Sequence, residues 1–287
     1  MRKWWLSLRP FSFPASLLPA VLGLVLAAKS KPLDPLGAWL ALITSLTLHI
    51  VANLFNSYFD WQFGHDQPEG SQVIPLLRDS HRGPRLLKVY GLCFLLLAVV
   101  LIIILGLRYR PLVMLIALIG LFSAYFYTAP PLMLKKRGLS LPTVFITMGI
   151  LIPLNAYMIQ ADTFNWQVVT KSTPLALLIT AILQGNELRD YHPDLQHGIS
   201  SFTTVCGLKA GIKLYQLLIA LPYILVLALV AARLLPILSA GIVLSSRFAA
   251  ALAKKADQHD FTSLDSATAK LYTAFSALYI LAQVFSR

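Results

Sequence analysis

The sequence predicts an all-α polytopic membrane protein with about nine transmembrane helices around a central, lipid-accessible cavity. Hydrophobic residues make up 57% of the 287 residues and charged residues only 13%, whereas a soluble domain carries about 25% charged residues. Mean hydropathy is +0.70. A spanning helix needs about 20 mostly apolar residues. Nine segments meet or approach this length: 11–28, 36–58, 86–106, 111–127, 141–160, 173–188, 211–232, 234–252 and 267–286.

Proline marks several joins between these segments. Pro111 starts one segment, Pro142 opens another, and Pro236 separates the seventh from the eighth, as expected of a residue that interrupts helices. No stretch between the segments is large enough for a soluble domain, so we expect residues 1–287 to form a single transmembrane domain. The sequence carries no signal of oligomeric state.

Charge predicts orientation and partners. With the N-terminus in the cytoplasm, most of the 24 Lys and Arg residues fall in cytoplasmic loops, which is the bias of inserted membrane proteins. The net charge of +12 therefore indicates membrane topology and a lipid environment, not a nucleic-acid partner. We expect a multi-pass protein of a bacterial inner or plasma membrane, with its N-terminus and active-site loops in the cytoplasm.

Acidic residues gather on that same predicted side. Of the 12 Asp and Glu residues, all but Asp34 and Asp162 lie there. Asp and Glu contribute little to insertion, so topology does not explain the clustering. Most of these acids lie in two groups, just after the second and sixth predicted spans.

The first group follows the second span. Asn53, Asn56 and Asp60 have the spacing i, i+3, i+7, which places them on one face of a helix. Gly64 is a plausible helix stop, and Asp66 is expected on the loop beyond it. A strip of oxygen ligands therefore leaves the end of this span.

The second group closes the sixth span, where Asn186, Asp190 and Asp194 are spaced by four. Pro193 predicts a helix end near Tyr191, with Asp194 on a loop. Solvated helix ends would explain either group alone. Two such groups on one side of the membrane favour a divalent-cation site, and carboxylate and amide oxygens suit Mg²⁺ shared with substrate phosphates.

Basic and aromatic residues supply the remaining candidates. Lys135 or Arg137 is expected to neutralise a diphosphate, and Tyr127 to line its pocket, although positive-inside topology alone also predicts a basic triplet at 135–137. Arg78 lies in the long loop 59–88. Arg189 either clamps phosphate or pairs with its acidic neighbours.

Together these motifs resemble the UbiA superfamily of intramembrane prenyltransferases over nearly the whole chain. The resemblance rests on Asn56-x-x-x-Asp60, on the run Tyr-Thr-Ala-Pro-Pro-Leu-x-Leu-Lys at 127–135, and on Asn-x-x-Arg-Asp-x-x-x-Asp at 186–194. It implies Mg²⁺-dependent transfer of a prenyl chain from an isoprenyl diphosphate to an aromatic acceptor. The spacings within the two acidic motifs look most like the MenA branch, which prenylates 1,4-dihydroxy-2-naphthoate in menaquinone synthesis.

Three positions depart from the family pattern. Ser57 stands where the family usually has Asp, Met133 where Arg is frequent, and Ser200-Ser201 where Lys-Thr or Arg-Thr is common. Each departure lowers the charge near the expected diphosphate site. Two alternatives therefore stay open, namely a UbiA-type terpene cyclase that needs no acceptor, and a non-catalytic lipid-binding or transport protein. The polar groups lie at span ends and not at the midplane, which argues against transport.

The resemblance implies a role for each candidate residue. The expected catalytic residues are Asp60, Asp190 and Lys135. The expected substrate-binding residues are Asn53, Asn56, Arg78, Tyr127, Lys135 and Arg189. The expected Mg²⁺ ligands are Asn56, Asp60, Asp66, Asn186, Asp190 and Asp194.

Overall fold

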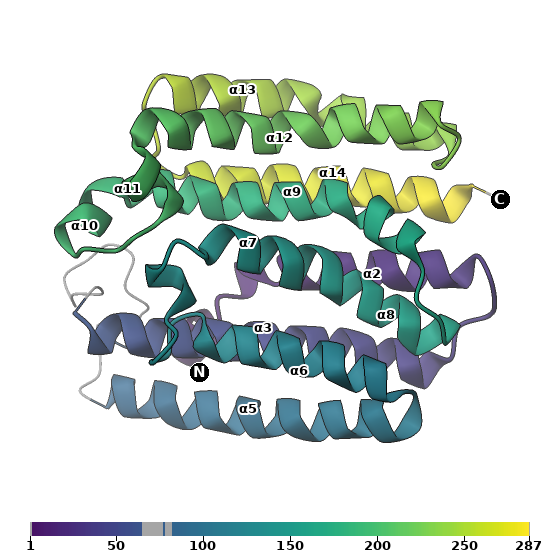
Figure 1. The fold of residues 1–287 in the computed structure, drawn as a ribbon, viewed down its shortest axis with the longest axis horizontal. Coiled ribbons are helices and arrows are strands. Elements are labelled where there is room, and N and C mark those ends of the chain that lie inside the picture. Colours follow the sequence, from purple (N-terminus) through teal and green to yellow (C-terminus); the bar gives the residue numbers. More distant parts are fainter. Residues whose placement is uncertain (1, 65–76, 78–81, 287) are drawn as a thin grey trace.

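The computed structural model describes residues 2–64, 77 and 82–286. Over these residues the chain is built from helices and their connections, and one isolated backbone bridge joins Arg137 to Ser200. The long helices lie side by side in a bundle, with α3, α5 and α6 on one side and α12 and α13 on the other (Figure 1). The predicted all-α class is confirmed.

Each of the nine predicted segments is helical. The short helix α1 (Arg2–Ser7) precedes the first segment, which begins within η1 (Pro10–Ser12). The fifth has three parts, α7 (Ser140–Val144), η3 (Phe145–Leu151) and α8 (Ile152–Ala161). The first half of the eighth is η4 (Ile237–Ser245). The other long helices are α2 (Pro14–Ala28), α3 (Pro35–Gln62), α5 (Gly83–Arg108), α6 (Pro111–Phe126), α9 (Trp166–Arg189), α12 (Leu208–Ala231), α13 (Ser246–Asp257) and α14 (Leu264–Phe285).

Seven of these segments are long and apolar enough to cross a membrane. α6 is apolar but has only 16 residues, and α14 is not among the seven. The number nine therefore stays a prediction.

The outer surface and the interior of the bundle are both apolar. Large hydrophobic side chains such as Leu107, Leu244 and Phe285 are 85%, 80% and 73% exposed, as expected where lipid replaces water. Inside, two buried tyrosines direct their hydroxyl groups to partners. Tyr215 shares a hydrogen bond of 2.6 Å with Thr268, and Tyr279 donates to the Lys171 carbonyl at 2.9 Å.

Small residues bring the central helices together. A Cβ atom on Gly23 of α2 would lie 2.1 Å from the Pro153 carbonyl oxygen of α8, and one on Gly149 of η3 would lie 2.2 Å from the Ala176 Cβ of α9. Close backbone approach of this kind is how membrane helices gain packing energy. These contacts fix how α9 sits in the bundle and so where its polar end emerges.

Candidate active site

The two acidic motifs come to the same end of the bundle, which we call the motif end. α3 and α9 both finish there, next to the segment 127–139 and to the short helices α10 (Tyr191–Gln196) and α11 (Phe202–Cys206) (Figure 1). The bridge between Arg137 and Ser200 ties the loop after α6 to the loop after α10. Segments far apart in the sequence are thus joined at one site.

The first motif lies on α3, which extends to Gln62, so the predicted helical spacing of Asn53, Asn56 and Asp60 is present. Asp60 is only 6% exposed. The Asn56 Oδ1 and Ser57 Oγ atoms are buried and have no hydrogen-bond partner in the part of the chain that the structure describes. A buried polar atom without a partner is costly, so these oxygens are suited to accept a bond from a ligand.

Lys135 is held against this motif. Its Nζ lies 2.8 Å from Asp60 Oδ2, and its backbone N–H donates to the Tyr127 carbonyl at 2.9 Å. Burial lowers the pKa of Lys135, but the nearby carboxylates of Asp60 and Asp194 raise it by more. The pKa therefore lies above its ordinary value, and the side chain carries a fixed positive charge between the two motifs.

Tyr127 lies close to the same carboxylates. Burial raises the pKa of its phenol well above the ordinary value, and the charges of Glu187, Asp60 and Asp194 raise it further. The hydroxyl group therefore stays protonated. It is available to donate a hydrogen bond to an anion.

The second motif runs from the end of α9 into the short helix α10. Asn186 is the half-buried residue one turn before Asp190, whose backbone N–H donates to the Asn186 carbonyl at 2.9 Å. Asp194 lies within α10 and not on a loop, so that expectation was wrong. Pro193 is accommodated because it stands in the first turn of α10, where a backbone N–H has no helical acceptor.

Negative charge accumulates around Asp194. Burial raises its pKa to about 7; Lys135 opposes the rise, and the carboxylates of Asp190, Glu187 and Asp60 add to it. Carboxylates from both motifs thus influence one group. This excess of negative charge would be relieved by a cation.

Arg189 forms ion pairs with two carboxylates, those of Asp190 and Asp265. Its guanidinium bonds to both oxygens of Asp190, at 2.8 and 2.7 Å, and to Asp265 at the start of α14. Of the two predicted roles, pairing with acidic neighbours is the one this geometry displays. Asp265 carries no motif signal in the sequence, because it lies 76 positions from Arg189.

Glu187 is a further buried carboxylate that the site prediction missed. It is 5% exposed, accepts a hydrogen bond from the Ser140 hydroxyl, and accepts from the backbone and hydroxyl of Thr203. It therefore joins α9 to α7 and α11. In the sequence it is signalled only as a member of the acidic group after the sixth span, between Asn186 and Asp190.

Two predicted residues lie outside the described part of the chain, namely Asp66 and Arg78. Asn53 is described, and its side-chain amide donates to the Leu8 carbonyl and to Ser12 Oγ, each at 3.1 Å. Its predicted contact with substrate stays a prediction.

The donor set fits Mg²⁺ in its chemistry. No group of three or more His, Cys, Asp or Glu residues is preassembled as a metal site among the described residues. The site nevertheless offers an unpartnered amide oxygen on Asn56 and an excess of carboxylates around Asp194. Mg²⁺ prefers oxygen ligands and usually completes its shell with water and substrate phosphate.

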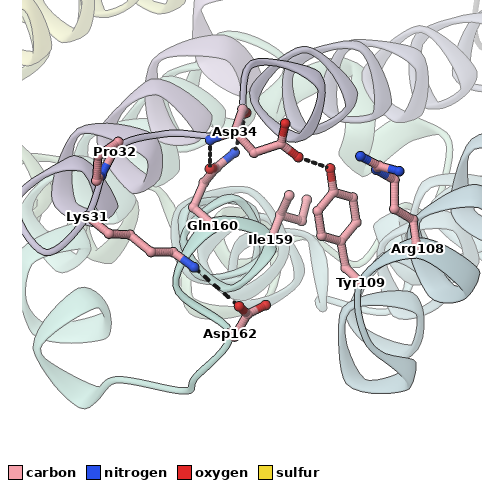
Figure 2. Close-up of a pocket in the computed structure, with 8 residues that line it drawn as sticks. All are labelled: Lys31, Pro32, Asp34, Arg108, Tyr109, Ile159, Gln160 and Asp162. Carbon is pink, nitrogen blue, oxygen red and sulfur yellow. Dashed lines mark hydrogen bonds and ion pairs between the residues drawn. The ribbon is translucent and has the colours of Figure 1, made fainter.

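The opposite end of the bundle, the far end, holds a polar pocket of about 320 Å³. Figure 2 shows that its side chains bind one another: Tyr109 donates to Asp34 at 2.7 Å, Gln160 is paired with the Asp34 backbone, and Lys31 meets Asp162 at 3.2 Å. Its lining comprises Lys31, Pro32, Asp34, Arg108, Tyr109, Ile159, Gln160 and Asp162.

Comparison with known proteins decides the family. The model of the UbiA prenyltransferase family matches residues 16–276. The chain belongs to the UbiA prenyltransferase family. As a UbiA-type enzyme it is an integral, multi-pass membrane protein and a prenyltransferase, which confirms the expectation drawn from the motifs.

Relatives within the UbiA family are similar at comparable levels. The chain is 30% identical to 1,4-dihydroxy-2-naphthoate octaprenyltransferase of Bacillus subtilis (strain 168) over 226 residues, 79% of this chain and 73% of that protein. It is 31% identical to UbiA prenyltransferase domain-containing protein 1 of Xenopus tropicalis over 291 residues, 98% of this chain and 81% of that protein.

Solved UbiA structures share the fold. A UbiA homolog from Archaeoglobus fulgidus bound to DMAPP and Mg²⁺ superposes with a TM-score of 0.69 at 15% identity, covering 96% of both chains. The apo structure of a UbiA homolog from Aeropyrum pernix K1 gives a TM-score of 0.68 at 17% identity, covering 94% of this chain and 97% of that one.

Proposed function

We propose that this UbiA-family protein transfers a prenyl group from an isoprenyl diphosphate to an aromatic acceptor of the 1,4-dihydroxy-2-naphthoate type, as a step of menaquinone biosynthesis. The observation that carries the proposal is the fixed charge of Lys135 between Asp60 of the first motif and Asp194 of the second. The name of the Bacillus relative supports the acceptor. The basic loops support a site facing the cytoplasm.

Oxygen ligands from the two motifs would hold Mg²⁺. These ligands are Asn56, Asp60, Asn186, Asp190 and Asp194, with Asp66 from the segment beyond α3. When bound, the metal supplies Lewis-acid stabilisation of the negative charge on the diphosphate. Its presence in a solved UbiA homolog with DMAPP supports this dependence.

The protein's own residues promote loss of the diphosphate. The bond between the prenyl C1 and the bridging oxygen breaks, and both electrons stay on the diphosphate. Lys135 and the Tyr127 hydroxyl group stabilise that charge, which is the electrostatic strategy of sites that bind developing anions. Phe59 and Tyr125, whose ring centroids are 6.3 Å apart, lie on the segments that carry Asp60 and Tyr127 and help to keep water from the allylic cation.

The acceptor ring then attacks the allylic cation and forms the new carbon–carbon bond. A ring carbon that carried hydrogen must lose that proton to restore its aromatic system. We assign Asp190 as the acceptor of this proton. Its side chain is 40% exposed, and Arg189 holds both of its oxygens in a fixed orientation.

The test is diphosphate release by the purified protein in detergent. Geranylgeranyl or farnesyl diphosphate is supplied with Mg²⁺, with and without 1,4-dihydroxy-2-naphthoate, and EDTA is the control. We expect release that needs both Mg²⁺ and the acceptor, together with a prenylated naphthoate in the product.

Other outcomes would contradict the proposal in distinct ways. Acceptor-independent release with a cyclic product would indicate a terpene cyclase. Release with a different aromatic acceptor would keep the prenyltransferase and reject the naphthoate. Absence of release with every donor and acceptor would indicate a binding protein.

A further inference from the structure

The segment that precedes α2 is fastened to α3 by buried contacts. The Leu8 side chain is 3% exposed and packs in one cluster with Ile50, Leu54 and Leu87. Its carbonyl accepts from the Asn53 amide at 3.1 Å. Residue 8 is therefore held by apolar burial and by a hydrogen bond from the same face of α3 that carries Asn56 and Asp60.

Ser12 links the same segment to α3 by a second set of hydrogen bonds. Its hydroxyl group donates to the Arg9 carbonyl at 2.7 Å, so its oxygen accepts from Asn53 at 3.1 Å and from His49 Nε2 at 2.8 Å. Asn53 thus holds both flanks of Arg9, at Leu8 and at Ser12. This explains why its amide faces the N-terminal segment.

The backbone of Arg9 is constrained between these flanks. Arg9 has φ 55° and ψ 56°, a left-handed conformation that non-glycine residues keep only where the surroundings determine it. Pro10 follows directly, and the Ser12 N–H also donates to the Arg9 carbonyl at 2.9 Å. The network therefore sets the direction in which the Arg9 side chain leaves the segment.

Arg9 lies on the segment that Asn53 holds, one helical turn from Asn56, and its side chain has no counter-ion among the described residues. It is half-buried, and no carboxylate among the described residues forms an ion pair with it. Its charge acts on Lys135, where repulsion opposes the rise of the lysine pKa. An arginine without an ion pair, beside the motif whose Asp60 contacts Lys135, favours a polyanion as the partner of both cations.

We propose that Arg9 is a further diphosphate-binding residue, and that Asn53 acts on the substrate through Arg9 as a positioning residue. This inference rests on the proposed function and adds a residue that neither acidic motif contains. The guanidinium fork forms paired hydrogen bonds to phosphate oxygens. A diphosphate would then be held by Lys135 on one side and Arg9 on another.

The first experiment measures competitive inhibition of turnover by inorganic diphosphate in wild type, Arg9→Gln and Arg9→Lys. Arg85→Gln is the matched control, because Arg85 is an exposed arginine at the same end of the bundle. Loss of one charge-assisted contact should raise the inhibition constant of Arg9→Gln about tenfold. Arg9→Lys should recover part of this loss, and the KM for the aromatic acceptor should not change.

The second experiment is a double-mutant cycle between Asn53→Leu and Arg9→Gln. If Asn53 acts through Arg9, Asn53→Leu alone raises the inhibition constant, and the double variant is no worse than Arg9→Gln. Additive effects would overturn the positioning role and restore direct substrate contact by Asn53. Unfolding midpoints in detergent report whether the variants fold.

The two proposals fail in different ways. If wild type turns over and Arg9→Gln keeps the inhibition constant of Arg85→Gln, the Arg9 assignment is wrong and the proposed function stands. If wild type releases diphosphate from no donor, the proposed function is wrong, and the Arg9 assignment falls with it.

Discussion

The two ends of the bundle are both polar, but they use their polar groups differently. At the far end, Asp34 accepts from Tyr109, and Lys31 pairs with Asp162 (Figure 2). Asp34 also accepts from the backbone N–H groups of Leu36 and Gly37. At the motif end, Asn56 Oδ1 has no partner among the described residues, and carboxylates surround Asp194. The polar groups of the far end pair with one another and so join the loops that carry them. The motif end has polar groups that a ligand could still pair with.

This comparison also shows that a hollow alone does not identify a site. The far-end pocket has a definite volume and charged walls, yet its acidic groups already have partners. At the motif end, the decisive feature is a set of polar and charged groups that lack partners among the described residues and that lie on helices held in place by packing. Substitutions at the two ends should therefore have different consequences.

The largest effect is expected for Asp60→Asn. Loss of this carboxylate removes a proposed metal ligand and the ion-pair partner of Lys135, so kcat/KM should fall by at least about 100-fold. Asp162→Asn is the matched control at the far end, because Asn tolerates the left-handed φ of 57° found at that position. Its kcat/KM should stay within about twofold of wild type, as expected of a substitution away from the site.

A folding defect must be separated from a chemical one in this comparison. Asp60→Asn leaves Lys135 without its ion-pair partner, which destabilises a partly buried site. The double variant Asp60→Asn, Lys135→Gln removes both charges and should recover part of the unfolding midpoint. Recovery of activity along with stability would show that Asp60 has no role in the reaction.

The motif end was largely predictable because helical periodicity is local. The spacing of Asn53, Asn56 and Asp60 required only that α3 continue past the apolar segment, and Gly64 ends it with φ 74°. The contacts that join Arg189 to Asp265 were not predictable. They depend on how α9 and α14 are placed against each other, which is set by packing and not by spacing along one helix.

For the same reason, spacing predicts a substrate role for Asn53 but not its contacts with the N-terminal segment. Its position on the α3 strip is correct, but the strip is long enough to meet more than one neighbour. At the C-terminal end of the strip, Asp60 forms an ion pair with Lys135. At its N-terminal end, Asn53 donates hydrogen bonds to Leu8 and Ser12. Sequence spacing places residues on a face without showing which element covers each part of it.

A smaller effect is expected for Ser140→Ala at the motif end. The Ser140 hydroxyl group donates to the buried Glu187 carboxylate, so its removal should lower the free energy of unfolding by about 1–3 kcal/mol. Ser266→Ala is the control, because Ser266 is exposed and bonds only to the Ser263 carbonyl. Equal unfolding midpoints for the two variants would show that Glu187 does not depend on this donor.

Tyr109→Phe should have a still smaller effect on stability, and that effect should depend on pH. The Tyr109 hydrogen bond is the main cause that lowers the pKa of Asp34, and Arg108 contributes. A lowered folded-state pKa stabilises the fold above the ordinary pKa of about 4, and this stabilisation is lost as pH falls through the folded value. The difference in unfolding midpoint between wild type and Tyr109→Phe should therefore be present at pH 7 and shrink toward pH 3. A difference that is constant with pH would show that Asp34 does not contribute through its charge.

The smallest effect is expected for the ion pair between Lys31 and Asp162 at the far end. Their side chains are 43% and 49% exposed, and exposed pairs contribute about 0–1 kcal/mol because solvent screens them and ordering two long side chains costs entropy. A double-mutant cycle of Lys31→Gln and Asp162→Asn should give a coupling energy in this range that vanishes at high salt. A larger, salt-resistant coupling would mean that the far end excludes solvent and resembles the motif end more closely than its exposed side chains indicate.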